Sequence, residues 1–148
     1  MDVKVAHEKT TDQLMNDIMQ DDKVEKFLSE NQGEMQDMSL SAYLRFLLKE
    51  KGVKKADVFR KAELVGSNYG YEIFRNDKKT PSRDILLMIS LAFPLTIEET
   101  QQALRRAGLA ILYPRDLRDA YVLYGLKNQI GVENLNALLV EKGLKPLT

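Results

Sequence analysis

Cysteine is absent from this chain of 148 residues, and histidine occurs once, at His7. The absence of cysteine excludes disulfides, thiolate metal sites and cysteine nucleophiles, and it fits a reducing compartment. A single histidine near the N-terminus argues against a histidine-based metal or catalytic cluster. We therefore expect neither a bound metal nor a cofactor.

Long apolar runs and catalytic motifs are also lacking. The longest apolar run, from Ile85 to Phe93, is interrupted by Ser90 and stops at Pro94, so it is too short to span a bilayer. The first residues contain no apolar signal-peptide core. The sequence has no glycine-rich phosphate loop after a strand, and no acidic pair that comes with a second catalytic group. These absences predict a cytoplasmic protein without membrane association that is not an enzyme.

The apolar residues that are present predict helices throughout. Hydrophobic residues make up 44% of the chain, which is enough for a folded core. Apolar positions recur at helical spacing, and no segment alternates with the period of two that a strand requires. We expect an all-α protein of seven or eight helices, with an acidic helical arm over 1–38, a five-helix core over 39–107 and a C-terminal helical extension over 108–148.

The charges are segregated along the chain although the net charge is zero. Residues 1–39 contain four bases and ten acids, a net charge of −6. Residues 40–83 contain eleven bases and five acids, a net charge of +6, while residues 84–148 contain seven of each. A basic region of this kind favours a polyanionic partner.

The stretch from Gly66 to Arg83 combines a short polar helix with a basic loop. Ile73 and Phe74 are adjacent apolar residues that can anchor the helix to a core. Thr80-Pro81 then predicts the start of the next helix, because threonine is a common N-cap and proline fits the first helical position.

Two helix-like segments, 41–51 and 54–64, precede this stretch and are joined by Gly52. Gly52 is expected in the left-handed conformation that ends many helices. The order of helix, glycine turn, helix, short polar helix, basic loop and proline-started helix is the order that a DNA-binding helix-turn-helix requires.

Side chains that commonly cap helices predict the other helix starts. Thr10 and Thr96 each begin a capping box, with Gln or Glu three residues later. Ser41 and Asp22 are further candidate N-caps, and Pro114 is expected to begin a helix near the C-terminus.

A weak internal echo occurs at an offset of 35 residues. The first set comprises Glu98, Leu104, Gly108, Leu109 and Leu112, and the second comprises Glu133, Leu139, Gly143, Leu144 and Leu147. A solenoid needs about three units. We interpret the echo as shared helix-end chemistry and keep a true repeat as the alternative.

From Leu44 to Phe93 the chain resembles the phage-repressor-like (XRE) helix-turn-helix family. The matching features are the helix ending at Lys51-Gly52, the second helix, the polar helix over 67–75, and the basic loop that leads into Pro81-Ser82. The fuller pattern, YGYEIF at 69–74, PSRD at 81–84 and LYPRDLRD at 112–119, resembles a group of bacterial helix-turn-helix proteins.

The resemblance implies a sequence-specific, DNA-binding transcriptional regulator with a lambda repressor-like core. Its recognition helix, 67–76, would read the major groove of double-stranded DNA. Among the departures from the family pattern, Phe59 stands where a small residue is usual, and Gly70 lowers the stability of so short a helix by about 1 kcal/mol relative to alanine.

The predicted DNA-binding residues share polarity and a place in this segment. They are Lys54, Lys55, Ser67, Asn68, Tyr69, Tyr71, Glu72, Arg75, Lys78 and Lys79. The lysines suit phosphates, while Asn68, Glu72 and Arg75 suit base edges. The alternatives are a solvated polar face for the charged residues and core packing for the tyrosines.

Other features favour partners besides DNA. The alternative to a DNA-binding regulator is a protein-interaction adaptor or signalling module that keeps the helix-turn-helix shape. We hypothesise that the apolar faces of 117–126 and 132–140 form a homodimer interface, since one recognition helix reads only a few base pairs. The cluster of Arg115, Asp116, Arg118 and Asp119 is interpreted as ion pairs around a helix start, with a regulatory anion or partner site as the alternative.

The acidic arm suggests regulation or docking. Its apolar side chains could dock a protein partner, and its charge of −6 could compete with DNA for the basic residues 40–83. The alternative is that its acidity only keeps the arm in solution.

Overall fold

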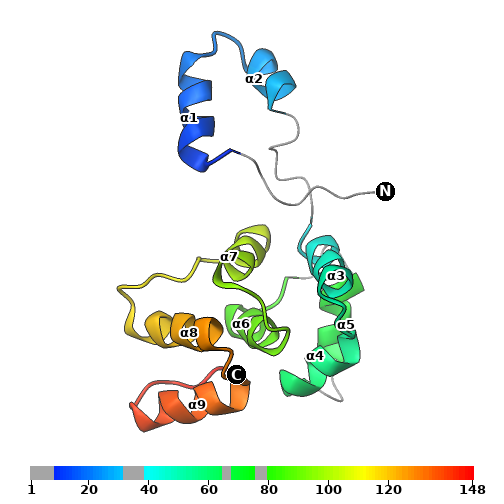
Figure 1. The fold of residues 1–148 in the computed structure, drawn as a ribbon, viewed down its shortest axis with the longest axis vertical. Coiled ribbons are helices and arrows are strands. Elements are labelled where there is room, and N and C mark those ends of the chain that lie inside the picture. Colours follow the sequence, from blue (N-terminus) through cyan, green and yellow to red (C-terminus); the bar gives the residue numbers. More distant parts are fainter. Residues whose placement is uncertain (1–8, 32–38, 65–67, 76–79) are drawn as a thin grey trace. The chain divides into compact units, whose positions relative to one another are not determined.

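The computed structural model describes residues 9–31, 39–64, 68–75 and 80–148, with the side chains of Asn68 and Tyr69 outside the described part. These ranges hold nine helices and no strand, so the all-α prediction is confirmed, while the expected number of seven or eight helices is too low (Figure 1). The helices are α1 (Thr11–Gln20), α2 (Val24–Glu30), α3 (Leu40–Lys51), α4 (Lys55–Lys61), α5 (Asn68–Arg75), α6 (Arg83–Ala92), α7 (Ile97–Arg106), α8 (Leu117–Asn128) and α9 (Gly131–Glu141). The chain divides into two compact units, Met1–Met38 and Ser39–Thr148.

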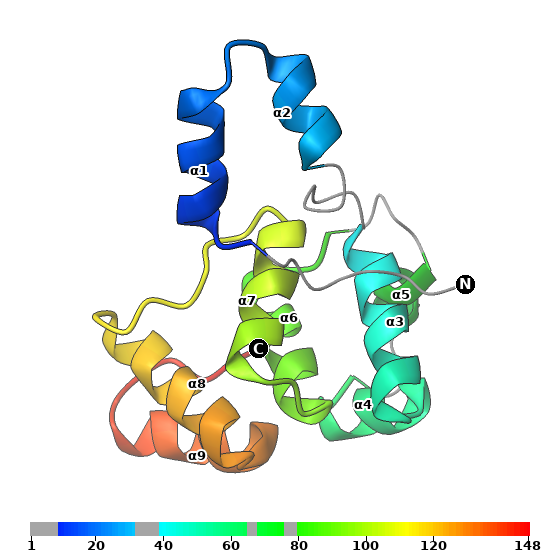
Figure 2. The same cartoon turned by 45° about the horizontal axis from the view of Figure 1, so that its top comes forward.

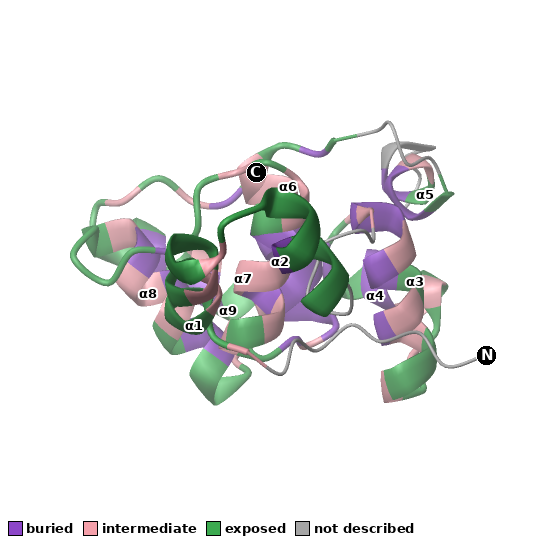
Figure 3. Cartoon of the chain, turned by 90° about the horizontal axis from the view of Figure 1, so that it is seen from above, coloured by how far each residue is buried: buried purple, intermediate pink, exposed green. Residues whose placement is uncertain are grey.

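The first unit contains α1 and α2, which pack against each other. The predicted capping box at Thr10 is present, because the Thr10 hydroxyl oxygen accepts from the Gln13 N–H and the Gln13 side-chain oxygen accepts from the Thr10 N–H. The prediction that Asp22 caps α2 is wrong, since the N-cap residue is Lys23 and no side chain caps this end. In α1 no residue is buried, and Figure 3 shows this helix as exposed or intermediate along its length.

The second unit is organised around α6. All residues from Leu86 to Ala92 are buried, which matches the nearly all-round apolar sequence of this helix. Helices α4, α7, α8 and α9 pack against α6, and α3 packs against α5 and α7. Figures 1 and 2 both show α8 beside α9 and α3 beside α5.

Three predicted helix starts in this unit need correction. The N-cap of α3 is Ser39, because its hydroxyl oxygen accepts a hydrogen bond from the Ala42 N–H, while Ser41 lies inside the helix. The N-cap of α6 is Ser82 in place of Thr80, since the Ser82 hydroxyl reaches the Ile85 N–H. The N-cap of α8 is Asp116, so Pro114 precedes the helix without beginning it. In each case a nearby polar side chain reaches the N–H three residues along.

Other helix ends match the local chemistry of the sequence. Gly52 is left-handed, with φ of 64°, and the Val53 N–H donates to the Leu48 carbonyl as in a Schellman ending. The capping box at Thr96 is complete, because the Glu99 N–H donates to the Thr96 hydroxyl oxygen at 3.1 Å and the Thr96 N–H donates to the Glu99 carboxylate at 2.9 Å.

The echo at an offset of 35 is a structural repeat, so its interpretation as helix-end chemistry alone is wrong. Gly108 and Gly143 both end a helix with positive φ, 71° and 73°. In both halves the side-chain amide of one residue exchanges two hydrogen bonds with a leucine backbone 11 residues later. The Gln101 amide nitrogen donates to the Leu112 carbonyl at 2.9 Å, and the Leu112 N–H donates to the Gln101 amide oxygen at 2.8 Å. The corresponding distances between Asn136 and Leu147 are 3.0 and 2.7 Å.

The two repeats, 83–113 and 118–148, also exchange ion pairs. Arg83 forms two hydrogen bonds with Asp119, at 2.9 and 2.8 Å, and Arg118 forms two with Asp84 at the same distances. Arg83 and Asp84 lie 35 residues before Arg118 and Asp119. The arginine of each repeat therefore forms an ion pair with the aspartate of the other repeat, as expected for a two-fold related pair.

Candidate nucleic-acid interface

Helices α4 and α5 meet where Phe59 faces Gly70. A Cβ atom placed on Gly70 would lie 3.0 Å from Phe59 Cε1 and 3.1 Å from Phe59 Cδ1. The two departures from the expected pattern therefore compensate each other, because the missing side chain at Gly70 makes room for the large ring. Sequence reasoning found both residues but did not connect them.

The Phe59 ring is the centre of an aromatic cluster beneath α5. It makes edge contacts with Tyr71 and Phe74, with ring centroids 4.5 and 5.3 Å apart. Phe74 in turn stacks on Phe93 at 6.3 Å. Ile73 and Phe74 are almost fully buried, as expected for the anchors of this short helix.

Two side chains of α3 hold the C-terminal end of α5. The Ser41 hydroxyl, which is fully buried, donates a 2.6 Å hydrogen bond to the Ile73 carbonyl. The Arg45 guanidinium donates a hydrogen bond of the same length to the Phe74 carbonyl. The last carbonyls of a helix have no partner within the helix. The side chains of α3 supply those partners and fix α5 in place.

The outward side of α5 carries Tyr71, Glu72 and Arg75. Arg75 forms an ion pair with Glu72 at 2.9 Å, and its side chain is 66% exposed. Tyr71 is 41% exposed, and the Lys55 ammonium lies 5.4 Å from the centre of its ring. This face combines two cations, one carboxylate and a partly exposed aromatic ring.

The structure brings together only part of the predicted DNA-binding set. Lys55, Tyr71, Glu72 and Arg75 lie on or beside the outward side of α5. Lys54 is exposed and is the N-cap residue of α4. The remaining predicted residues, Ser67, Lys78 and Lys79 and the side chains of Asn68 and Tyr69, lie outside the described part of the chain.

A polar network that the sequence did not reveal joins α3 to α7. Lys51 forms a 2.8 Å ion pair with Glu99, and the Arg106 guanidinium lies 4.6 Å from the centre of the Tyr43 ring. Burial raises the pKa of Tyr43 to about 12, an effect that Glu99 increases and Arg106 opposes. Burial also opposes ionisation of Glu99, but the hydrogen bonds from Lys51 and the Thr96 backbone lower its pKa. The network fixes α3, which in turn holds α5.

The acidic and basic cluster at the start of α8 acts as an ion-pair lattice for Arg118 and Asp119. Burial disfavours the charged forms of Asp84 and Asp119, yet the hydrogen bonds and charges of Arg118 and Arg83, together with the backbone N–H groups of Thr148 and Tyr113, outweigh it and lower both pKa values. Arg83 also donates to the carbonyls of residues 110 and 111, and Arg118 to those of 145 and 146. Both guanidinium groups are thus engaged by the fold.

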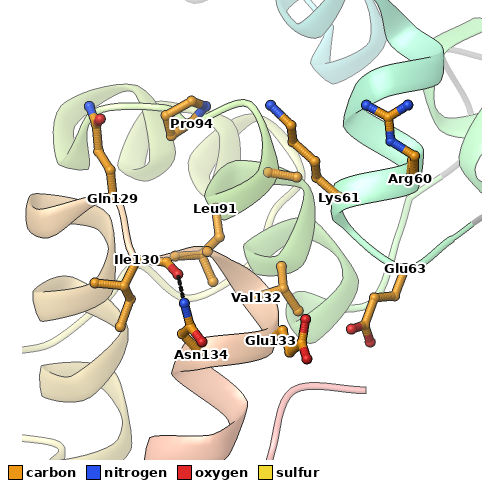
Figure 4. A pocket seen from close by; sticks show the side chains of 12 residues that line it. Arg60, Lys61, Glu63, Leu91, Pro94, Gln129, Ile130, Val132, Glu133 and Asn134 are labelled. Atoms are coloured by element: carbon orange, nitrogen blue, oxygen red, sulfur yellow. Dashed lines mark hydrogen bonds between the residues drawn. The ribbon is translucent and has the colours of Figure 1, made fainter.

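A pocket of about 410 Å³ lies between the end of α4, the turn after α6 and the turn before α9. Figure 4 shows Arg60 and Lys61 pointing in the same direction, away from Glu133. Glu63 and Glu133 line the pocket together with these two cations, so its charge is mixed and selects neither an anion nor a cation.

Among the described residues, no helix is long and apolar enough to cross a bilayer. Within the same ranges, no three potential metal-binding His, Cys, Asp or Glu residues form a cluster. Comparisons of the chain with models of protein families, with curated proteins and with solved structures give no match.

Proposed function

We propose that the unit Ser39–Thr148 binds double-stranded DNA as a sequence-specific transcriptional regulator, with α4 and α5 as its helix-turn-helix. The observation that carries this proposal is the way in which α5 is packed and hydrogen-bonded to the rest of the unit. Its inner side is buried on Phe59, and Ser41 and Arg45 hold its last carbonyls. A short helix fixed from behind, with a polar outward side, has the features of a recognition helix.

The charge distribution supports the same proposal. The segment 40–83 has a net charge of +6, Lys54 and Lys55 stand at the start of α4, and Lys55 lies beside Tyr71 on the outward side of α5. Lysines in these places can neutralise phosphates and orient the protein on the duplex. The base edges would then be read from α5.

Arg75 is the described residue best suited to direct readout. Arginine can form two hydrogen bonds with a guanine edge in the major groove. In the free protein Arg75 is paired with Glu72, and both side chains are at least one-third exposed, so the pair contributes little stability. Arg75 can therefore exchange Glu72 for a base at small cost.

The second candidate is a protein-interaction adaptor that uses the same face. The partly exposed ring of Tyr71 favours it, since aromatic side chains such as tyrosine are enriched at protein interfaces. An adaptor would bind duplex DNA only weakly and without sequence preference.

The proposal is tested by electrophoretic shift of the DNA upstream of the protein's own gene over a salt series. Replacing Lys54 or Lys55 by alanine should weaken binding to all sequences alike, and should reduce the slope of log affinity against log salt by about one unit. Arg75→Ala should relax preference at one base pair, at a cost of about 1–3 kcal/mol. Lys142→Ala, an exposed lysine beyond α9, is the matched control and should behave as the parent. Absence of duplex affinity at low salt would refute DNA binding and leave the adaptor.

A further inference from the structure

An open apolar strip runs along α8. Together with one residue of α9, it lines a groove of about 410 Å³, formed by Leu117, Ala120, Tyr121, Tyr124 and Leu138. Leu117 is 62% exposed and Tyr124 is 52% exposed. The α8 members lie at spacings of three and four residues, so they share one side of the helix.

The structural repeat shows what this strip corresponds to. Subtracting 35 maps Tyr121, Tyr124 and Leu138 onto Leu86, Ile89 and Ala103. These three counterparts are fully buried, whereas Ser82 and Ile85, the counterparts of Leu117 and Ala120, are exposed and half-buried. If the second repeat were covered in the same way as the first, the part of the strip formed by Tyr121, Tyr124 and Leu138 would be buried.

The first repeat packs against helices that have no counterpart beside the second. Helix α4 packs on α6, and α3 packs on α7. The main packing partners of α8 and α9 are instead each other and the helices of the first repeat. Among the described residues of this unit, the strip on α8 therefore lies on a repeat that lacks the additional helices of the first.

We propose that the partner of this strip is a second copy of the chain, packed with α8 antiparallel to α8. A two-fold axis through the midpoint between Ala120 and Tyr121 places Tyr121 of each copy against the small Ala120 of the other. The same axis places Leu117 of each copy opposite Tyr124 of its mate, because the two residues are equally far from the midpoint. The strip is thus complementary to itself, as an isologous interface requires.

Charge complementarity supports this arrangement. The N-terminal end of α8 carries Asp116, and its last turn carries Lys127, both exposed. In an antiparallel pair, Lys127 of each copy lies at the end of the strip that holds Asp116 of the other. A parallel pair would bring like charges together at both ends, which is unfavourable.

The inference deepens the proposed function, since two copies supply the two recognition helices that a palindromic site requires. It is tested without DNA, so its failure is separate from a failure of DNA binding. A dimer that binds no duplex would overturn only the regulator, and a monomer that binds duplex would overturn only the interface.

The first experiment measures the mass of the full chain by sedimentation equilibrium from 1 to 100 µM. Leu117→Glu should raise the dissociation constant of the dimer at least about 30-fold, because it places a charge in an apolar contact. Val140→Glu is the matched control, since Val140 is 61% exposed and does not line the groove. It should leave the mass unchanged. A monomer in the parent, or equal effects of both substitutions, would overturn the proposal.

The second experiment uses the absence of cysteine. Leu117→Cys and Tyr124→Cys chains, mixed and oxidised, should form a disulfide-linked heterodimer in higher yield than either variant forms alone. Val140→Cys should give only background. A chain that is dimeric by mass but crosslinks equally in all mixtures uses another face, and this result would refute the antiparallel packing. Circular dichroism spectra that match the parent show that each variant is folded.

Discussion

The contact between Gly70 and Phe59 can be tested because two physical effects oppose each other there. In an exposed helix, replacing glycine by alanine stabilises the helix by about 1 kcal/mol. At Gly70 the added Cβ would lie 3.0, 3.1 and 3.4 Å from three atoms of the Phe59 ring. The first two distances are shorter than an ordinary van der Waals contact, so the ring or α5 must move.

The ring has little room to move. Phe59 is 2% exposed and is held by edge contacts with Tyr71 and Phe74. Overpacking of a buried site costs about 1–3 kcal/mol, which exceeds the gain in helix propensity. We expect Gly70→Ala to lower the free energy of unfolding by about 1 kcal/mol, and to lower Tm by roughly 3–6 °C in a unit of this size.

A double-mutant cycle separates the two effects in urea unfolding followed by circular dichroism. Phe59→Leu removes the ring and should cost about 1–2 kcal/mol on its own. In the double variant the new Cβ at position 70 occupies part of the vacated space, so the two costs should not add, and the coupling should be at least about 1 kcal/mol. If Gly70→Ala stabilises the protein by the full propensity difference, or if the cycle shows no coupling, then the packing argument is wrong.

Acid sensitivity and the role of the arm give two further predictions. The pKa values of Asp84 and Asp119 are lowered in the fold, so their stabilising contribution is present above the ordinary aspartate pKa of about 3.9 and is lost as the pH falls through the lowered values. The free energy of unfolding, measured in urea, should therefore decrease as the pH is lowered past about 4. Asp84→Asn should be less stable than the parent at neutral pH, and its free energy of unfolding should decrease less steeply in acid. An unchanged acid dependence in this variant would contradict the assignment. A variant that begins at Met38 should remain folded, because Ser39–Thr148 is a compact unit, and it should bind DNA several-fold more tightly at low salt, with a gain that shrinks as salt screens the acidic arm. Unchanged or weaker binding by the folded truncation would exclude competition by the arm.

Features that depend on neighbouring residues could be predicted from the sequence. The capping boxes at Thr10 and Thr96, the left-handed Gly52 and the buried centre at Leu86–Ala92 all follow from local patterns. Even so, Ser39 and Ser41 are equally good caps in isolation. Ser41 does not cap the helix, because its buried hydroxyl donates a hydrogen bond to the carbonyl of Ile73, 32 residues away.

Features that depend on distant residues could not be derived in this way. The motifs around Arg83 and Arg118 were visible, but which aspartate each arginine contacts is decided by the packing of α6 against α8. For the candidate site, the sequence identified α5 and its polar residues. It did not show that Glu72 pairs with Arg75, or that Gly70 and Phe59 are one feature, because both depend on how side chains pack.

The exchange of ion pairs between the two repeats has a consequence for biosynthesis. As the chain leaves the ribosome, α6 and α7 emerge before any of their partners in the second repeat. Arg83 and Asp84 therefore cannot form their ion pairs until Asp119 and Arg118 have been synthesised. Asp84 also accepts a hydrogen bond from the Thr148 N–H, 64 residues downstream. Long-range contacts of this kind form late and slow the completion of a fold. The surface of α6 that faces the second repeat stays open to other chains until residues 118–148 have been made, and during that interval the nascent protein is most exposed to misassembly.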